Sequence, residues 1–348
     1  MARVLLAPFG TKPKTVLLGF LIVISVFSMF MSNTATAAMM LAFLAPVLAV
    51  LPKDDKGRIG LSLAIPIAAN LGGIGTPIGT PPNATAVRFL ADGGYEISFV
   101  TWMIHMIPYV IVMIVLAWIL LQFFFPFKSD KVILEIPENK RKKDWKTTVV
   151  WITFLGTILL WMTERWHGIN SYVVALIPLI GYTCTGIIKT ADIKTMNWDV
   201  IWLIAGGIAL GDALGKTGLA AKLANIIDYA QYSGLMIVIL LSIIGWALSN
   251  FISNSATAAL LMPILAIVCG AMGDKLAPIG GTPTVLIGVA IAASSAMILP
   301  ISTPPNALAF ATGFVQQKDM AKMGTLMGII SMVLGFGLVY LMGTLKFL

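Results

Sequence analysis

The chain has 348 residues, of which 58% are hydrophobic and only 11% are charged. Soluble domains carry roughly 25% charged residues, so this composition excludes a water-soluble globular protein. The net charge of +8 does not indicate nucleic-acid binding, because Lys and Arg are distributed over separate loops. The sequence has no H-E-x-x-H, G-x-S-x-G or phosphate-binding motif, so nothing specific favours an enzyme.

Apolar runs long enough to cross a hydrocarbon core of about 30 Å recur along the chain. The alternating pattern of a membrane β-barrel is absent, and unpaired backbone groups are not tolerated in lipid, so these runs predict helices. The sequence therefore predicts an all-α polytopic membrane protein. The clearest runs cover residues 99–125, 147–162, 172–188, 200–214 and 324–345.

Two polar motifs occur twice, in the same order. Ser32-Asn33-Thr34 recurs as Ser253-Asn254-Ser255, and Thr80-Pro81-Pro82-Asn83 recurs as Thr303-Pro304-Pro305-Asn306. The spacing between the copies is nearly the same for both motifs, which indicates duplicated halves of a transporter. Each Ser-Asn motif lies midway along an apolar stretch, where polar residues would only destabilise a plain spanning helix. This position predicts a re-entrant hairpin in each half, followed by a helix broken at Pro-Pro.

The distribution of basic residues predicts the topology. If residues 15–50 enter and leave the membrane on one side, most of the 23 Lys and Arg fall in loops on that side. The positive-inside rule then places the N-terminus in the cytoplasm and the C-terminus outside. The expected location of the protein is the inner (plasma) membrane of the cell. The second hairpin opens to the opposite side, so the repeats are predicted to be inverted.

The predicted organisation has two repeats and a basic linker. Residues 1–126 form an incomplete first repeat, with a re-entrant hairpin at 15–50, a broken helix at 61–90 and a helix at 99–126. Residues 127–146 form a basic cytoplasmic linker. Residues 147–348 form the second repeat, with helices over 147–232, a re-entrant hairpin at 233–271, a broken helix at 278–315 and a helix at 323–346.

The first half is shorter than the second. Between Trp145 and Asn254 lie three predicted spanning segments and the mildly amphipathic stretch 216–232, whereas only 32 residues precede Asn33. We therefore expect a chain that is truncated or abbreviated at its N-terminus, with a naturally asymmetric architecture as the alternative.

The motif residues suit an anion and a cation together. A hairpin that stops within the membrane exposes a helix start, which attracts anions, and a helix end, which attracts cations. The Pro-Pro pairs remove backbone donors and free carbonyls such as those of Gly79 and Ser302. The motifs contain no Asp, Glu or His, which argues against a carboxylate proton relay, and no Lys or Arg to neutralise an anion. Bound cations and helix starts are then expected to balance the anion's charge, so the two ligands would bind interdependently.

On these paired motifs the sequence resembles the divalent anion:sodium symporter family. The resemblance implies a scaffold that dimerises and a transport domain with two re-entrant hairpins that moves as an elevator. It also implies sodium-coupled symport of C4 dicarboxylates such as succinate, malate and fumarate. The implied substrate-binding residues are Ser32, Asn33, Thr34, Ser253, Asn254, Ser255 and Thr303. The implied sodium-binding residues are Ser28, Ser32, Asn33 and Gly79 at one site, and Ser249, Ile252, Asn254, Ser302 and Pro304 at the other.

The expected partners are thus a small dicarboxylate, sodium ions, the lipid bilayer and a second copy of the chain if the scaffold is complete. No cofactor is expected beyond sodium as the coupling ion. Ser255 replaces the family's usual threonine, which retains a hydroxyl but loses a methyl group. Two other functions stay open: a sodium-independent dicarboxylate exchanger, and a non-transporting subunit or fragment. An anion channel is a weaker alternative.

Overall fold

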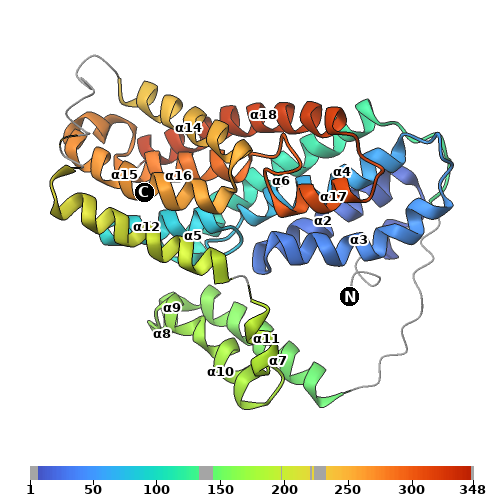
Figure 1. Cartoon of the computed structure of the whole chain (residues 1–348), viewed down its shortest axis with the longest axis horizontal. Coiled ribbons are helices and arrows are strands. Elements are labelled where there is room, and N and C mark those ends of the chain that lie inside the picture. Colours follow the sequence, from blue (N-terminus) through green and yellow to red (C-terminus); the bar gives the residue numbers. More distant parts are fainter. Residues whose placement is uncertain (1–6, 133–143, 197, 220–221, 223–232, 346–348) are drawn as a thin grey trace.

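The computed structural model describes residues 7–132, 144–196, 198–219, 222 and 233–345, and all regular structure in them is helical (Figure 1). The first half contains η1 (Ala7–Phe9), α2 (Pro13–Phe30), α3 (Asn33–Val50), α4 (Gly57–Gly73), α5 (Pro81–Asp92) and α6 (Phe99–Phe124). The middle contains α7 (Trp145–Met162), α8 (Glu164–His167), α9 (Ser171–Val174), α10 (Leu176–Cys184), α11 (Thr190–Lys194) and α12 (Trp198–Lys216). The remainder contains α14 (Gly234–Phe251), α15 (Asn254–Met272), η3 (Gly273–Ile279), α16 (Thr282–Ser294), α17 (Pro304–Ala311) and α18 (Gln317–Thr344). The all-α prediction is confirmed for these residues.

Five of these helices, α2, α6, α7, α14 and α18, are long and apolar enough to cross a membrane. Large apolar side chains point outward from several of these helices, as at Ile152, Phe123 and Val333, which are 67%, 75% and 63% exposed. Water would make such surfaces costly, whereas lipid accommodates them.

One predicted spanning run is divided. Residues 172–188 form α9 and the nine-residue α10 rather than one helix. Pro178 accounts for the interruption, because its ring clashes with the carbonyl group four residues earlier, at the end of α9. Gly186 then adopts a left-handed conformation (φ 64°) in the turn that follows α10. The run is nevertheless helical over Ser171–Cys184, with the single turn residue Ala175 between the two helices. Part of the predicted helical region 147–232, residues 220–221 and 223–232, lies outside the described residues.

At each Ser-Asn motif one helix ends and the next begins, and the two motifs do this in the same way. Met31 ends α2 in an extended conformation, and Ser32 caps α3 by accepting a hydrogen bond from the amide three residues ahead at 3.2 Å. Ile252 and Ser253 repeat this arrangement between α14 and α15, again with a 3.2 Å capping bond. Only two extended residues therefore separate the end of one helix from the start of the next in each pair.

The core is built around two buried helices, α4 and α16. Helix α4 packs against α2, α3 and α6, and α16 packs against α14, α15 and α18. The short helices after the Pro-Pro breaks cross over: α5 packs against α15 and α16, while α17 packs against α3 and α4. The two halves therefore interlock, and each completes part of the other's packing (Figure 1).

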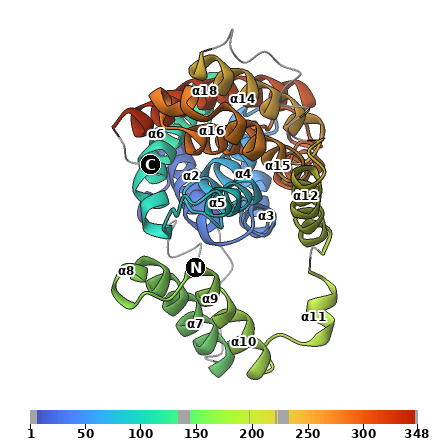
Figure 2. The same ribbon diagram turned by 90° about the vertical axis from the view of Figure 1, so that its left-hand side faces the viewer.

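Helices α7 to α10 lie together beside this bundle, below it in both views, and α11 stands apart from them in Figure 2 (Figures 1 and 2). Aromatic side chains join the group to the bundle: the rings of Phe99 and Trp161 stack with centroids 4.9 Å apart, and Phe30 meets Phe154 edge-on at 6.4 Å. Helix α12 packs against α15 instead.

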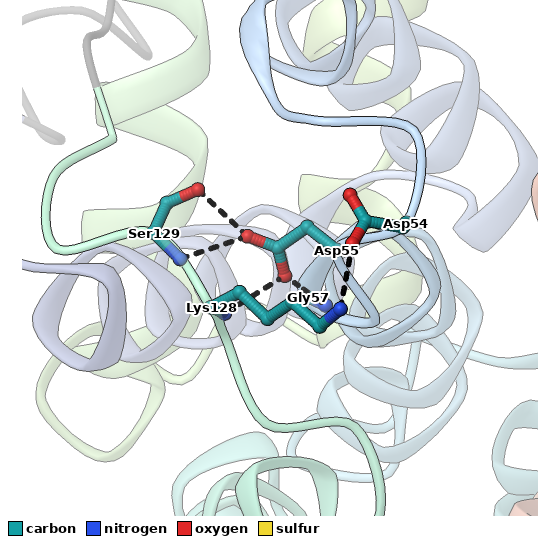
Figure 3. Close-up of polar contacts among 5 residues, drawn as sticks. All are labelled: Asp54, Asp55, Gly57, Lys128 and Ser129. Atoms are coloured by element: carbon teal, nitrogen blue, oxygen red, sulfur yellow. Dashed lines mark hydrogen bonds and ion pairs between the residues drawn. The ribbon is translucent and has the colours of Figure 1, made fainter.

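A buried carboxylate ties the start of the basic linker to the bundle (Figure 3). Asp55, in the loop between α3 and α4, is 2% exposed and accepts four hydrogen bonds. The donors are the amides of Gly57 (2.8 Å), Lys128 (3.2 Å) and Ser129 (3.0 Å) and the Ser129 hydroxyl (2.7 Å). The neighbouring Asp54 forms an exposed ion pair with the Lys128 ammonium at 2.6 Å. Most of the linker, residues 133–143, lies outside the described residues.

Candidate substrate and cation site

Both pairs of motifs meet at one cavity of about 670 Å³. Its wall includes all seven predicted substrate-binding residues, Ser32, Asn33, Thr34, Ser253, Asn254, Ser255 and Thr303. Ligand cavities typically measure about 300–1,000 Å³, so this one can hold a small organic ligand. Residues more than 200 positions apart in the sequence are thus brought to one place by the interlocked packing of the halves.

Four helices begin at this cavity. Their N-cap residues, Ser32, Thr80, Ser253 and Thr303, all lie in its wall. A helix start carries unsatisfied amide groups and the positive end of the helix dipole, equivalent to about half a charge. Four such starts make the cavity favourable for an anion, and more so for one with two carboxylates.

No charged side chain occurs among the described residues that line the cavity. The polar groups there are hydroxyls, amides and main-chain groups of Ser, Thr, Asn and Gly. An anion bound in this cavity would therefore be balanced by helix dipoles and by any cations that bind nearby, rather than by Lys or Arg.

Oxygen atoms converge beside the first hairpin tip. One terminal atom of the Asn33 amide lies 2.6 Å from Ser28 Oγ, 3.2 Å from the Ala69 carbonyl oxygen and 3.1 Å from the Gly79 carbonyl oxygen. The Ser28 hydroxyl donates to the Ala69 carbonyl at 2.7 Å. Without a cation, the amide nitrogen belongs at this position, because it can donate to both carbonyls. With the amide turned by half a rotation, its oxygen would lie beside three others, those of the Ser28 hydroxyl and the Ala69 and Gly79 carbonyls. Neutral oxygens of this kind are the donors that a hard cation prefers.

The second hairpin tip repeats part of this arrangement. Ser249 Oγ lies 2.7 Å from Asn254 Oδ1 and 2.9 Å from the Ala293 carbonyl oxygen. Ser302 occupies the position that corresponds to Gly79, and its hydroxyl donates to the Asn250 carbonyl at 2.9 Å. Both tips therefore gather neutral oxygens from a hydroxyl, an amide and main-chain carbonyls.

The asparagines of the Pro-Pro motifs hold the broken backbone together. The Asn83 amide nitrogen is 3.1, 3.2 and 2.8 Å from the carbonyl oxygens of Gly73, Ile74 and Thr76. The Asn306 nitrogen donates to two carbonyls of the corresponding turn, both at 2.9 Å. Each side chain thus satisfies carbonyls that the interrupted helix leaves free.

The predicted sodium ligands fall into two groups. Ser32, Asn33, Gly79, Asn254 and Pro304 line the cavity itself. The remaining four are not part of its wall: Ser28 and Ser249 lie behind the asparagines, Ser302 bonds to Asn250, and Ile252 is the extended residue that ends α14.

Sequence reasoning missed Asn70, which also lines the cavity, and the carbonyl groups of Ala69 and Ala293. Asn70 is the single asparagine of helix α4 and lies in its apolar second half, and an isolated amide in such a segment could have drawn attention. The two alanines give no signal in the sequence, because their contribution comes from the main chain.

Interlocked broken helices around a cavity lined in part by hydroxyls and amides, in a chain with several membrane-length helices, are typical of a transporter of a small solute. Residues 1–280 match the citrate transporter family. The chain is 32% identical to the sodium-dependent dicarboxylate transporter SdcS of Staphylococcus saprophyticus, over 95% of this chain and 70% of the relative. It is 31% identical to the SdcS protein of Staphylococcus aureus, over 95% of this chain and 69% of the relative.

The chain therefore belongs to this family of carboxylate transporters, and the predicted membership in the divalent anion:sodium symporters is confirmed. It is a multi-pass membrane transporter and not an enzyme.

Proposed function

We propose that this chain carries small dicarboxylates across the inner (plasma) membrane in symport with sodium ions. The preferred substrates are C4 dicarboxylates such as succinate, malate and fumarate. The observation that carries the proposal is the cavity at which four helices begin, with no charged side chain in its described wall. The names of the two relatives, both described as sodium-dependent dicarboxylate transporters, support it.

The cavity's electrostatics favour coupling over simple anion binding. Helix starts attract a dianion, but dehydrating two carboxylates is costly, and no Arg or Lys compensates among the described lining residues. Sodium ions at the two oxygen clusters would supply the missing positive charge a few ångströms from the substrate. Each ligand then raises the affinity for the other, which is the thermodynamic basis of symport.

The proposed roles follow the two clusters. The first sodium ion is bound by Ser28, Ser32, Asn33 and Gly79, and the second by Ser249, Ile252, Asn254, Ser302 and Pro304. The dicarboxylate contacts Ser32, Asn33, Thr34, Ser253, Asn254, Ser255 and Thr303. Asn33 and Asn254 each serve both ligands, because their amides lie beside an oxygen cluster and also line the cavity.

The transport cycle that we propose is an elevator movement. Helices α2 and α3, and α14 and α15, form two re-entrant hairpins in inverted repeats, and they move with the broken helices relative to a dimeric scaffold. The N-terminus lies in the cytoplasm and the C-terminus outside. Distances between labels on Ser233 and on a scaffold position in the presence and absence of sodium and succinate test this movement.

Uptake by purified protein in liposomes tests the proposed function. An inward sodium gradient should drive accumulation of radiolabelled succinate, and a proton gradient without sodium should not replace it. Robust uptake without sodium would contradict symport.

Two alternatives are separated by the same assay. A sodium-independent exchanger would take up succinate only when the liposomes contain a dicarboxylate, whatever the sodium gradient. A non-transporting subunit would show no uptake under either condition. Rescue of uptake by an added homologous N-terminal segment of about three helices would then show that transport needs those helices.

A further inference from the structure

Asn70 connects the first half of the chain to the substrate-facing threonine of the second half. It lies near the end of α4 and is fully buried. Its amide nitrogen is 3.2 Å from Thr303 Oγ1 and 3.3 Å from Asn306 Oδ1. These are hydrogen bonds between residues more than 230 positions apart, and Asn70 and Thr303 both line the cavity.

The protons in this network constrain what Thr303 can do. A threonine hydroxyl has one proton, and here it is donated to Asn306 Oδ1 at 3.0 Å. The Thr303 oxygen meanwhile accepts from the Asn70 amide and from the Asn306 main-chain nitrogen at 3.3 Å. In this arrangement the hydroxyl proton is unavailable to a ligand in the cavity.

Binding a carboxylate would require the Thr303 hydroxyl to turn its proton toward the ligand. Asn306 Oδ1 would lose that donor, and a buried acceptor without a partner is costly. The Asn70 amide already contacts this oxygen and would remain bonded to it. Asn70 therefore lets Thr303 exchange one acceptor for another without leaving Asn306 unsatisfied.

The corresponding positions around the first Pro-Pro break, Ser294, Thr80 and Asn83, contain no such network. Ser294 corresponds to Asn70, and its hydroxyl has no hydrogen-bond partner, nor does Asn83 Oδ1, which corresponds to Asn306 Oδ1. Thr80, the counterpart of Thr303, makes no side-chain capping bond. The network is thus a property of the second half-site alone among these two sets of described residues.

We propose that Asn70 is a positioning residue for the substrate, which acts through Thr303 and makes the second half-site the tighter contact for one carboxylate of the dicarboxylate. This inference rests on the proposed function and assigns a role within the same site. It predicts that a residue of the first half controls a substrate contact made by the second.

Succinate binding by the purified chain in saturating sodium tests the proposal. Asn70→Ala should weaken succinate binding about 10-fold, the effect of one disrupted buried hydrogen bond. Asn70→Leu, which has a similar shape but no donor, should lose about as much, so that a cavity left by alanine is not the cause. Ser294→Ala is the matched control at the corresponding position and should change affinity less than 2-fold. Sodium alone should raise the melting temperature of all these variants as it does for wild type.

A double-mutant cycle distinguishes positioning from packing. In a Thr303→Val background, Asn70→Ala should cause less than a 2-fold further loss, because the hydroxyl through which it acts is gone. Losses that multiply in the double variant, or wild-type affinity in both Asn70 variants, would overturn the inference. No succinate binding by the wild-type chain would overturn the proposed function and this inference with it.

Discussion

The first and second hairpin tips share a main-chain framework but differ in their side-chain partners. In both, a serine five residues before the motif asparagine contacts that asparagine, at 2.6 Å for Ser28 and 2.7 Å for Ser249. In both, the same serine contacts an alanine carbonyl near the end of the following core helix. The second tip adds hydrogen bonds from Ser302 and Thr303, whereas Gly79 and Thr80 stand at the corresponding positions of the first.

The comparison shows which features the two hairpin tips share and which occur at only one of them. The retained parts are helix starts, helix ends and the two asparagine amides, which are the groups that an anion and a cation require. The side-chain network around Thr303 is particular to one half. The two half-sites are therefore expected to contribute equally to cation binding through their asparagines. Their threonines are expected to differ, because Thr303 is held by side-chain hydrogen bonds and Thr80 is not capping its helix.

The largest difference between the halves is expected at Gly79. A Cβ atom added there would lie 2.4 Å from the Gly73 carbonyl oxygen, a main-chain atom that cannot move without disturbing the break. Gly79→Ala should therefore cost about 1–3 kcal/mol of stability and weaken sodium binding by 10-fold or more. The measurements are melting temperature and sodium titration of the purified protein.

Ser302→Ala is the matched change in the second half. It removes one hydrogen bond without adding atoms, so we expect a loss of only about 1 kcal/mol. Equal effects of the two substitutions would show that close main-chain packing at Gly79 is unimportant.

The two threonines should respond unequally to loss of the hydroxyl. Thr303→Val should destabilise the protein by about 1–2 kcal/mol, because it deprives buried groups of Asn70 and Asn306 of a partner. Thr80→Val should cost less than about 0.5 kcal/mol, because its hydroxyl caps nothing. Thermal unfolding in sodium without substrate measures both, and a larger loss for Thr80 would contradict the asymmetry.

A smaller effect on stability is expected at Asp55, which lies in the loop that joins α3 to α4 in the first half. In the second half, the corresponding connection is η3. Burial raises the pKa of the Asp55 carboxyl, but the bonds from the Ser129 hydroxyl and from three amides outweigh it and lower the pKa below its usual value. Asp55→Asn should therefore destabilise the protein by about 1 kcal/mol at pH 7. Asp54→Asn, which affects only the exposed pair with Lys128, should cause no measurable change.

The pH dependence of the Asp55 contribution follows from the direction of the shift. Because the pKa is lower in the folded than in the unfolded chain, the stabilisation is fully present above about pH 4. It is lost as the pH falls through the folded value. The stability difference between wild type and Asp55→Asn should accordingly narrow on acidification below about pH 4, and a difference that widens would contradict this account.

The sequence was sufficient to predict the helical class and the repeated motifs, because both follow from local chemistry. The seven predicted substrate-binding residues came from the resemblance to a known family, and other residues that line the cavity, such as Asn70, were missed. Serine and asparagine cap helices, and Pro-Pro breaks them wherever they occur in an apolar run. The division of residues 172–188 was missed, although Pro178 lies within that run, because hydropathy alone does not register the clash of a proline ring. The crossing of α5 and α17 into the opposite half has no local signature.

Contributions that depend on tertiary packing were also beyond the sequence. The Ala69 and Ala293 carbonyls lie beside Ser28 and Ser249 only because α4 and α16 pack against the helices that carry those serines. The contact between Asn70 and Thr303 likewise depends on how the halves interlock. Asn70 can be noticed in the sequence, but nothing there indicates that Thr303 is its partner.

The central claim, that sodium ions supply the charge that lets a neutral cavity bind a dicarboxylate, is tested most directly by titrating succinate at several sodium concentrations. The wild-type dissociation constant should fall steeply as sodium increases, and Asn33→Ala and Asn254→Ala should each weaken succinate binding about 5- to 150-fold and flatten that dependence. A succinate affinity that does not change with sodium, or an asparagine variant that retains both the affinity and its sodium dependence, would contradict the account.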